Sequence, residues 1–261
     1  WRYAPLPVPP GHVADAVRGL IALGFRGANV TVPHKEAALA QLDTVEPAAA
    51  ALGAVNTLVI DHSADTSTTI TGHNTDVPGF LAALRAGGFE PLGKRAVVIG
   101  AGGAARAVVY ALLSANARTV SVLNRTPTRA ATLVNELTPH AKSTALRSAP
   151  LTPARLVEAV RASDLLVNAT TVGMQPHKHA SVWPDEASVP THLTVMDLVY
   201  QPRETRLLTQ ARVAGAQAID GLGMLIHQGA LAFNLWTEHS HNLAEIIEAM
   251  SRAVESTDQA C

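Results

Sequence analysis

The sequence lacks the features of a disulfide-bonded or a strongly basic protein. Its single cysteine is the last residue, Cys261, so no disulfide framework is possible. That fits a reducing compartment, and we expect a cytoplasmic location. The net charge is −1 and no basic run occurs, so binding to nucleic acid or to an anionic membrane by bulk electrostatics is not expected.

Long apolar runs are also missing. No stretch approaches the roughly 18 consecutive apolar residues that a membrane-spanning helix needs. The opening residues, Trp1–Pro5, lack the charged lead and the apolar segment of a signal peptide. The sequence therefore predicts neither a membrane protein nor a secreted one.

What the sequence has is enough apolar material for a large core. Hydrophobic residues make up 48% of the 261 residues and charged residues 16%, which favours a folded protein of one large or two ordinary domains. The first third mixes helices and strands. We expect helices over 12–23, from Pro33 to about 52 and over 76–86, and strands over 28–32, 54–60 and 70–73, with a polar loop over 61–68.

A second pattern begins near Gly93, where strands alternate with helices. Ala96–Ile99 is apolar throughout, as expected of a strand buried on both faces of a parallel sheet. The alternation predicts an α/β fold with a doubly wound parallel sheet. We expect its further strands over 119–123, 165–168, 193–199 and 216–219, its helices over 104–113, 128–137 and 205–214, and two late helices over 221–236 and 242–254.

A glycine-rich turn joins the first of these strands to its helix. Gly100–Ala105 fits the pattern G-x-G-x-x-A in the right context, after a buried strand and before a helix. Gly100 allows the tight turn, Gly102 lets the backbone approach a pyrophosphate, and Ala105 permits close packing of the helix. A tight turn without a ligand is the alternative, but the pattern favours dinucleotide binding.

The end of the next strand indicates which dinucleotide is bound. An NAD site usually has an acidic residue there, for the ribose hydroxyls. Here the chain has Asn124–Arg129, with arginines at positions 125 and 129 and no acid. Arginines can bind a 2′-phosphate by charge-assisted hydrogen bonds. The pair favours NADP(H), unless both side chains are merely solvated.

Polar residues lie beside predicted strand ends in the first third, where a core does not need them. The most notable is Lys35, which the Pro33 helix start would place in a first helical turn, where the helix dipole disfavours a cation. A proton would leave such an ammonium more easily. Taken singly, each residue also has an ordinary explanation: a solvated Lys35, an Asn56 in a turn, or an Asp76 that caps a helix.

Taken together, these segments resemble the shikimate dehydrogenase family from about Val13 to Trp236. The resemblance rests on eight ordered motifs, Asn29–Lys35, Gly53–Thr57, Asn74–Asp76 with Gly79-Phe80, Gly100–Ala105, Asn124–Thr126 with Arg129, Asn168–Thr170 with Gly173-Met174, Asp197–Tyr200, and Gly221–Leu225 with Gln228. It implies two α/β domains, an N-terminal substrate domain (residues 1–80 and 223–261) and a Rossmann-type NADP-binding domain (81–222).

The resemblance also implies a reaction and a set of site residues. The reaction is the reversible, NADPH-dependent reduction of 3-dehydroshikimate to shikimate, on the pathway to chorismate and the aromatic amino acids. Lys35 and Asp76 would be the catalytic pair, with Asp76 directing the ammonium of Lys35. Both would also contact substrate, together with Thr31, Asn56, Tyr200 and Gln228. The residues implied to bind the cofactor are Gly100, Ala101, Gly102, Gly103, Ala104, Asn124, Arg125, Thr126, Arg129, Thr170, Leu198 and Gly221.

Several alternatives stay open. A quinate/shikimate dehydrogenase shares nearly every motif, an aminoshikimate-type relative differs in substrate, and a catalytically silent NADP-binding regulatory protein belongs to another class. The family's Ser-x-Ser pair for the substrate carboxylate has no counterpart in the sequence before Pro5–Val8.

No metal is expected, because the H-x-H pairs 177/179 and 239/241 lack nearby acids or cysteines. The chain would act on a small molecule, as a monomer or homodimer.

Overall fold

The computed structural model describes residues 1–62, 68–238 and 240–258. The loop predicted over 61–68 thus lies mostly outside the described residues. The chain divides into two compact units: unit 1 is Trp1–Thr75 with Leu231–Ile246, and unit 2 is Asp76–Ala230 with Ile247–Cys261. The predicted domains, 1–80 with 223–261 and 81–222, remain a prediction. Their bounds differ from the units mainly at residues 223–230 and 247–261.

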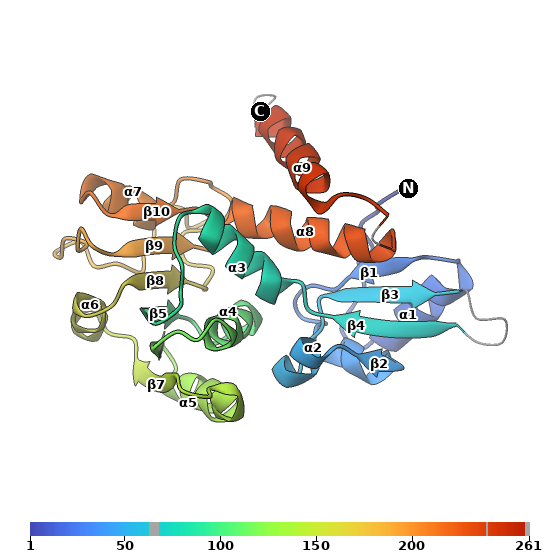
Figure 1. The fold of residues 1–261 in the computed structure, drawn as a ribbon, viewed down its shortest axis with the longest axis horizontal. Helices are drawn as coiled ribbons and strands as arrows, with labels where there is room; N and C mark the ends of the chain where they lie inside the picture. Colours follow the sequence, from blue (N-terminus) through green and yellow to red (C-terminus); the bar gives the residue numbers. More distant parts are fainter. Residues whose placement is uncertain (63–67, 239, 259–261) are drawn as a thin grey trace. The chain divides into compact units, whose positions relative to one another are not determined.

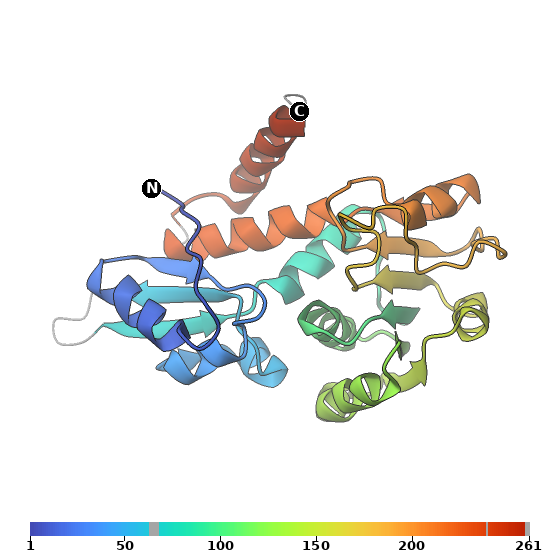
Figure 2. The same cartoon turned by 180° about the vertical axis from the view of Figure 1, so that it is seen from behind.

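Unit 1 is built on a four-stranded sheet in the order β1-β3-β4-β2. β3 runs antiparallel to β1 and β4, while β2 is parallel to β4. Helix α1 lies against this sheet in both views (Figures 1 and 2), and its Val17 and Leu20 pack with Leu58 and Ile60 of β3. The elements are α1 (Val13–Ala22), β1 (Gly27–Asn29), η1 (Ala37–Gln41), β2 (Thr44–Val45), α2 (Pro47–Leu52), β3 (Thr57–Asp61) and β4 (Thr69–His73).

Unit 2 holds a six-stranded parallel sheet in the order β10-β9-β8-β5-β6-β7. Figure 1 shows β10, β9, β8 and β5 side by side in this order, with β7 at the far edge of the sheet. The chain starts in the middle at β5, runs outward to β7, and returns to β8 on the other side of β5. This is the order of the dinucleotide-binding fold. The predicted α/β class with a Rossmann-type sheet is therefore confirmed.

The strands of unit 2 alternate with its helices along the chain. Their bounds are α3 (Asp76–Ala86), β5 (Arg95–Ile99), α4 (Gly103–Ser114), β6 (Thr119–Asn124), α5 (Pro127–Leu137), η2 (Thr138–His140), β7 (Ala145–Pro150), α6 (Pro153–Arg161), β8 (Leu165–Asn168), β9 (Thr194–Asp197), α7 (Arg206–Val213) and β10 (Gln217–Ile219). Two further helices, α8 (Leu222–Trp236) and α9 (Leu243–Asp258), contribute residues to both units. No helix in the described ranges is long and apolar enough to cross a membrane.

The central strands of unit 2 are buried on both faces, which explains their continuous apolar runs. Val97 and Ile99 of β5 pack with Leu156 of α6 and Leu207 of α7. Because side chains alternate along a strand, Ala96 and Val98 face the opposite side, where α4 contacts β5. Every one of these β5 residues is at most 2% exposed. The helices therefore cover both faces of the sheet, and the site residues lie where the strands end.

The helix expected from Pro33 to about residue 52 is wrong over most of its length. Residues 32–36 form turns, the five-residue 3₁₀ helix η1 follows, and only the last part, α2, is α-helical and ends where predicted. The carbonyl of Lys35, which an α-helix would bond to the N–H of Leu39, accepts instead from the backbone N–H of Val55 at 3.0 Å, while Leu39 bonds to Glu36. A tertiary hydrogen bond thus overrides the local helix signal. Lys35 consequently does not lie at the positive end of an α-helix dipole, and that explanation of its position fails.

The strand expected over 28–32 is shorter than predicted, for a similar reason. β1 ends at Asn29, opposite Thr57, the first residue of β3. One more hydrogen bond follows, from Val30 N–H to the Asn56 carbonyl at 2.8 Å, and then no partner strand continues among the described residues. Val32 is 76% exposed. Its β-branched side chain therefore belongs to the turn that carries Lys35.

Candidate active site

The polar motifs of unit 1 meet at one end of its sheet. β1 ends at Asn29, β3 begins at Thr57 opposite it, and β4 ends at His73 opposite Thr57. Because β3 is antiparallel to both neighbours, the segments that follow β1, precede β3 and follow β4 all leave the sheet on the same side. Three motifs that are far apart in the sequence therefore become neighbours.

Asn56 is the centre of a hydrogen-bonded group at this end of the sheet. Its side-chain oxygen accepts from the Thr75 backbone N–H at 2.8 Å and from the Thr57 hydroxyl at 3.1 Å, and its amide donates to the Thr75 hydroxyl at 3.0 Å. Asn29 donates to the Asn56 carbonyl at 3.3 Å and to the Thr57 hydroxyl at 3.2 Å. Asn56 and Thr75 are each 3% exposed. Hydrogen bonds in so buried a place fix the Asn56 amide in one orientation.

Lys35 and Thr31 lie in the turns after β1, anchored beside Asn56. The carbonyl of Lys35 is bonded to Val55, the residue before Asn56, and the N–H of Val30 is bonded to Asn56 itself. Thr31 is exposed and Lys35 half-buried. Unit 1 thus brings together three of the residues predicted to contact substrate.

Asp76 and Gln228 both lie in unit 2, where Gly79 of α3 closely approaches Gln228 of α8. Asp76 is the first residue of α3, where the helix dipole favours a negative charge, and it is 8% exposed. One turn later, a Cβ atom on Gly79 would lie 2.9 Å from the Cβ of Gln228 and 3.0 Å from its backbone nitrogen. Since residues three apart share a helix face, Asp76 and Gln228 lie on the same side of α3.

The turn after β5 has the features that a pyrophosphate needs. Gly100 has φ +115°, and a Cβ atom there would lie 3.0 Å from the Ala169 carbonyl oxygen and 3.1 Å from Cγ2 of Thr170. Only glycine readily adopts this conformation in so narrow a space. Gly102 and Gly103 border open space instead, because a Cβ atom on either would meet no described neighbour within 4 Å.

The start of α4 offers donors to that open space. Helix geometry leaves the first backbone N–H groups of α4 without an acceptor inside the helix, and the helix dipole attracts an anion to them. Ala104 is exposed beside them and Ala101 is half-buried, whereas Ala105 is fully buried in the helix–sheet contact. The turn therefore fits the phosphates of a dinucleotide.

Arg125 and Arg129 lie beside the end of β6, next along the sheet. Both are exposed, and neither forms an ion pair with another described residue. The amide of Asn124 donates to the Thr126 carbonyl at 2.9 Å and shapes the turn before α5. Arg129 is in the first turn of α5, where the dipole disfavours a cation. A bound phosphate would remove this conflict, which fits the NADP(H) prediction.

The loops after β8 and β9 carry the remaining predicted residues. Thr170 follows β8, Leu198 and Tyr200 follow β9, and Gly221 precedes α8. Gly100 contacts Thr170, and Gly221 contacts the backbone of Leu198, so these residues border the point where the strand order reverses. Tyr200 is 47% exposed. In unit 2, therefore, the predicted cofactor residues all lie at the carboxyl end of the sheet or beside it.

Sequence reasoning included two residues in its motifs without assigning them a role, and these two organise the loops. Asn168 ends β8 and Asp197 ends β9, and both are 0% exposed. The Asn168 amide donates to the Asp197 carboxylate at 2.9 Å. The sequence does carry a signal for this buried pair, because each of the two polar residues directly follows apolar residues at the end of its strand.

We predict that Gly221→Ala destabilises unit 2. A Cβ atom there would lie 2.5 Å from the Leu198 carbonyl carbon and 2.9 Å from the Asp197 carbonyl oxygen. Both are backbone atoms, so no side-chain rotation relieves the overlap, and a loss of about 1–3 kcal/mol in unfolding free energy is expected. Urea unfolding measures it.

Gly229→Ala is the matched control. Gly229 lies in helix α8, which begins directly after Gly221. Its nearest neighbour would be the Met250 sulfur at 3.8 Å, an ordinary van der Waals distance. Alanine is a better helix former than glycine, so this variant should be as stable as the parent or more stable by up to about 1 kcal/mol. Equal stability of the two variants would contradict the close approach at Gly221.

No cluster of three or more metal-ligating side chains occurs among the residues the structure describes. His177 and His179 lie in the loop between β8 and β9 and are exposed. His241 stacks on the ring of Phe233, at a centroid distance of 6.0 Å. The fourth histidine of the two pairs, His239, lies outside the described residues.

Comparison with protein-family models gives three matches along the chain. Residues 1–58 match the shikimate dehydrogenase substrate binding domain, and residues 83–205 match the shikimate / quinate 5-dehydrogenase model. Residues 221–250 match the shikimate 5′-dehydrogenase C-terminal domain. Together these matches cover most of the sequence.

Individual proteins agree with the family models. The shikimate dehydrogenase (NADP(+)) of Moorella thermoacetica is 45% identical over 256 residues, which cover 97% of this chain and 83% of that protein. Shikimate 5-dehydrogenase from Thermus thermophilus, solved with NADP(H) and shikimate, is 44% identical, with a TM-score of 0.76 over 96% of this chain and 85% of that one. The Listeria monocytogenes enzyme, solved with shikimate and NAD, is 33% identical, with a TM-score of 0.84 over 94% and 84%.

Proposed function

Because this chain belongs to the shikimate dehydrogenase family, we propose that it catalyses the reversible, NADPH-dependent reduction of 3-dehydroshikimate to shikimate. The observation that carries the proposal is the buried hydrogen-bonded group around Asn56. It ties the segment of Lys35, through Val55, to Thr75, the residue before Asp76. Lys35 is proposed to transfer the proton and Asp76 to direct the Lys35 ammonium. The segments of both residues are thus anchored at the same end of one sheet.

The proposed chemistry places a proton donor at the substrate carbonyl. When bound, the nicotinamide cofactor supplies the hydride in reduction and accepts it in oxidation. Hydride arrival leaves negative charge on the carbonyl oxygen, which must be stabilised or protonated. Lys35 donates that proton as a general acid and takes it back in the reverse direction. Asp76 directs the Lys35 ammonium by electrostatic attraction.

The cofactor is held in this proposal by the carboxyl end of the unit 2 sheet. Backbone N–H groups at the start of α4, beside Gly102 and Gly103, bind the pyrophosphate. Arg125 and Arg129 bind the 2′-phosphate by charge-assisted hydrogen bonds. The exposure of both arginines and the open space over both glycines support this assignment.

Substrate recognition in this proposal is polar. Thr31, Asn56, Tyr200 and Gln228 contact the hydroxyl and carboxylate groups of the substrate. The Asn56 amide is already fixed by hydrogen bonds to its neighbours, so its orientation is set before the substrate binds. Such a site discriminates strongly between ligands that differ by one polar group.

Substrate and cofactor preference is tested by four assays, which combine shikimate or quinate with NADP⁺ or NAD⁺. Formation of reduced nicotinamide is followed by absorbance. We expect kcat/KM to be highest for shikimate with NADP⁺. A higher value for quinate would favour the quinate/shikimate dehydrogenase alternative, which the name of the matching family model also keeps open.

A cytoplasmic location and a monomeric or homodimeric state belong to the same proposal. The single cysteine, which is the last residue of the sequence, fits a reducing compartment. Size-exclusion chromatography with light scattering would decide between monomer and dimer.

A further inference from the structure

A buried carboxylate that the proposed reaction does not use lies at the end of β9. Asp197 is 0% exposed and accepts three hydrogen bonds. The Asn168 amide and the Val199 backbone N–H donate to its Oδ1 at 2.9 Å and 3.1 Å, and the Thr205 hydroxyl donates to its Oδ2 at 2.7 Å. The three donors come from the end of β8, from the loop after β9 and from the residue before α7. One carboxylate therefore joins three segments.

Asn168 extends the group into the loop after β8. Its side-chain oxygen accepts from the Thr170 backbone N–H at 3.1 Å and from the Thr170 hydroxyl at 2.7 Å. Its amide donates a second bond to the Val172 carbonyl at 3.2 Å, and Val172 N–H returns one to the Thr170 hydroxyl at 3.1 Å. The loop 169–172 is thus held in one shape. We call Asn168, Thr170, Asp197 and Thr205 the Asp197 cluster.

Burial of the Asp197 carboxylate costs folding free energy that burial of an apolar side chain would not cost. Burial raises the pKa of the Asp197 carboxyl group, and the hydrogen bonds from Thr205, Val199 and Asn168 act in the opposite direction. A carboxylate without a cationic partner is expensive to bury. An apolar side chain could not supply two oxygens that accept hydrogen bonds from three segments at once. The Asp197 carboxylate therefore fixes how these three segments are arranged.

The position of the cluster indicates which part of the site it shapes. A Rossmann-type sheet has two mononucleotide-binding halves that meet at the switch point. The first half, β5 to β7, carries the phosphate turn and both arginines; the second half begins with β8 and β9. Asn168 and Asp197 of the cluster are the last residues of those two strands. Their hydrogen bonds fix Thr170 and also Val199, which lies between Leu198 and Tyr200. It therefore belongs to the nicotinamide half of the proposed site.

We propose that Asp197 is a positioning residue, which holds the loops after β8 and β9 in the shape that binds the nicotinamide half of the cofactor and the substrate. This inference rests on the proposed function and names a role in it for a side chain that touches neither ligand. The adenosine half, bound at β5 and β6, does not depend on Asp197.

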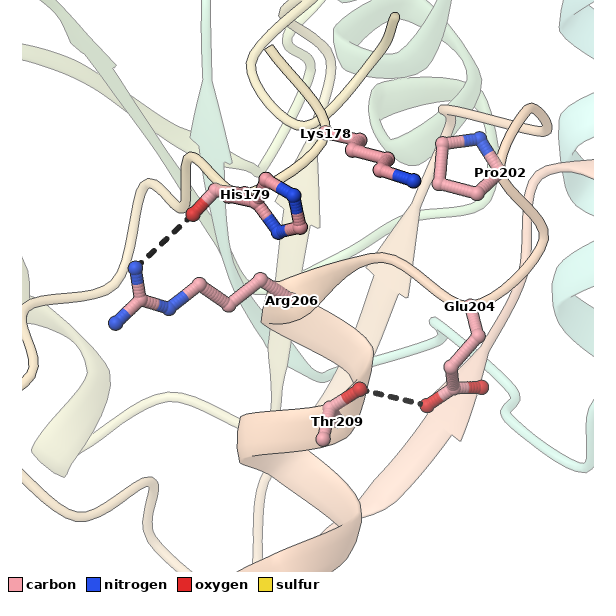
Figure 3. A pocket seen from close by; sticks show the side chains of 6 residues that line it. All are labelled: Lys178, His179, Pro202, Glu204, Arg206 and Thr209. Carbon is pink, nitrogen blue, oxygen red and sulfur yellow. Dashed lines mark hydrogen bonds between the residues drawn. The ribbon is translucent and has the colours of Figure 1, made fainter.

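A surface contact next to the cluster provides a control. A cavity of about 450 Å³ lies on unit 2 (Figure 3), and side chains from the loop before β9, from the loop after β9 and from the start of α7 line it. Arg206 donates to the His179 carbonyl at 3.0 Å, and the Thr209 hydroxyl donates to Glu204 at 3.1 Å. Thr209 is exposed and lies one turn after Thr205. Its loss removes the hydrogen bond to Glu204 and the one that the same hydroxyl donates to the Thr205 backbone carbonyl at 3.2 Å, but it leaves every side-chain hydrogen bond of the cluster in place.

The test compares Asp197→Ala, Thr205→Val and Thr205→Ser with the control Thr209→Ala, each in the chain of 261 residues. Calorimetry measures the affinity for NADPH and for 2′,5′-ADP, which has the adenosine and 2′-phosphate but no nicotinamide. Steady-state assays give KM for shikimate. For Asp197→Ala and Thr205→Val we expect about tenfold weaker NADPH binding and about tenfold higher shikimate KM, with 2′,5′-ADP affinity unchanged within about twofold. Thr205→Ser, which keeps the hydroxyl, and Thr209→Ala should resemble the parent.

Three results would distinguish failure of the positioning role of Asp197 from failure of the proposed function. Equal weakening of NADPH and 2′,5′-ADP by Thr205→Val would show a general structural defect and overturn the positioning role. Unchanged NADPH affinity and shikimate KM in both cluster variants would overturn it as well, while parent activity would leave the proposed function standing. A parent chain that binds NADPH but does not oxidise shikimate would instead refute the proposed function itself.

Discussion

Replacement of Lys35 by alanine is expected to lower kcat for shikimate oxidation by about 10²–10⁴-fold, the usual loss when a general acid–base group is removed. The hydrogen bonds that anchor this segment, Val55 N–H to the Lys35 carbonyl and Val30 N–H to the Asn56 carbonyl, involve backbone atoms only. The substitution therefore removes the ammonium and keeps these two backbone hydrogen bonds. Affinity for shikimate should change far less than kcat. Steady-state kinetics with saturating NADP⁺ measure both quantities.

Lys94→Ala is the matched control for the charge change. Lys94 precedes β5, at the end of the sheet opposite the phosphate turn, and its ammonium lies 3.9 Å from Asp164 in an exposed ion pair. Such pairs contribute little, so its kcat should equal that of the parent. Near-normal turnover of Lys35→Ala would refute the role of Lys35 in proton transfer.

Simultaneous replacement of Arg125 and Arg129 by alanine is expected to change cofactor preference. Each charge-assisted hydrogen bond to a 2′-phosphate contributes about 1.5–3 kcal/mol, so loss of both should weaken NADPH binding by at least about 10²-fold. NADH has no 2′-phosphate, and its affinity should change by less than about threefold. Fluorescence titration of the reduced nicotinamide measures both affinities.

Arg118→Ala controls for a nonspecific effect of positive charge. Arg118 is exposed and precedes β6, whereas Arg125 and Arg129 follow it, so Arg118 lies at the opposite end of the same strand. Its loss should leave both affinities unchanged. If the double variant lost NADPH and NADH affinity equally, the two arginines would not be the 2′-phosphate site.

The sheet of unit 2 could be predicted well because its strands are buried on both faces. The run Ala96–Ile99 has no polar residue, and the helix that follows begins within one residue of its expected start at Ala104. Strand β8 matches its predicted bounds, 165–168. In these segments local sequence and tertiary environment favour the same structure.

The elements that sequence patterns do not reveal are those whose burial is one-sided. β7 lies at the edge of its sheet, and most of its residues are exposed or half-buried, so it lacks an apolar run. Helix α6 is not among the predicted elements either, although the sequence carries signals for its start: Thr152 caps it by accepting from Arg155 N–H at 3.3 Å, and Pro153 is its first residue. Its Leu156 and Val160, four residues apart, mark the buried face.

For the candidate site, the sequence could supply residues but not how they meet. It indicates Lys35, Asn56 and Asp76 as polar residues near strand ends, yet the group around Asn56 exists only because β3 pairs with both β1 and β4. The helix dipole expected at Lys35 is absent because Val55 bonds to the Lys35 carbonyl. Hydrogen bonds between segments distant in the sequence, such as that from Val55 N–H to the Lys35 carbonyl, depend on tertiary structure. Local propensity does not encode them.

The central claim is that this chain reduces 3-dehydroshikimate with NADPH. It is tested most directly in a single turnover, with enzyme and NADPH in excess over 3-dehydroshikimate, nicotinamide absorbance followed in time and the product identified by mass spectrometry. The account predicts that one NADPH is oxidised for each shikimate formed. NADPH that binds but stays reduced, with 3-dehydroshikimate recovered unchanged, would contradict it and favour a catalytically silent NADP-binding protein.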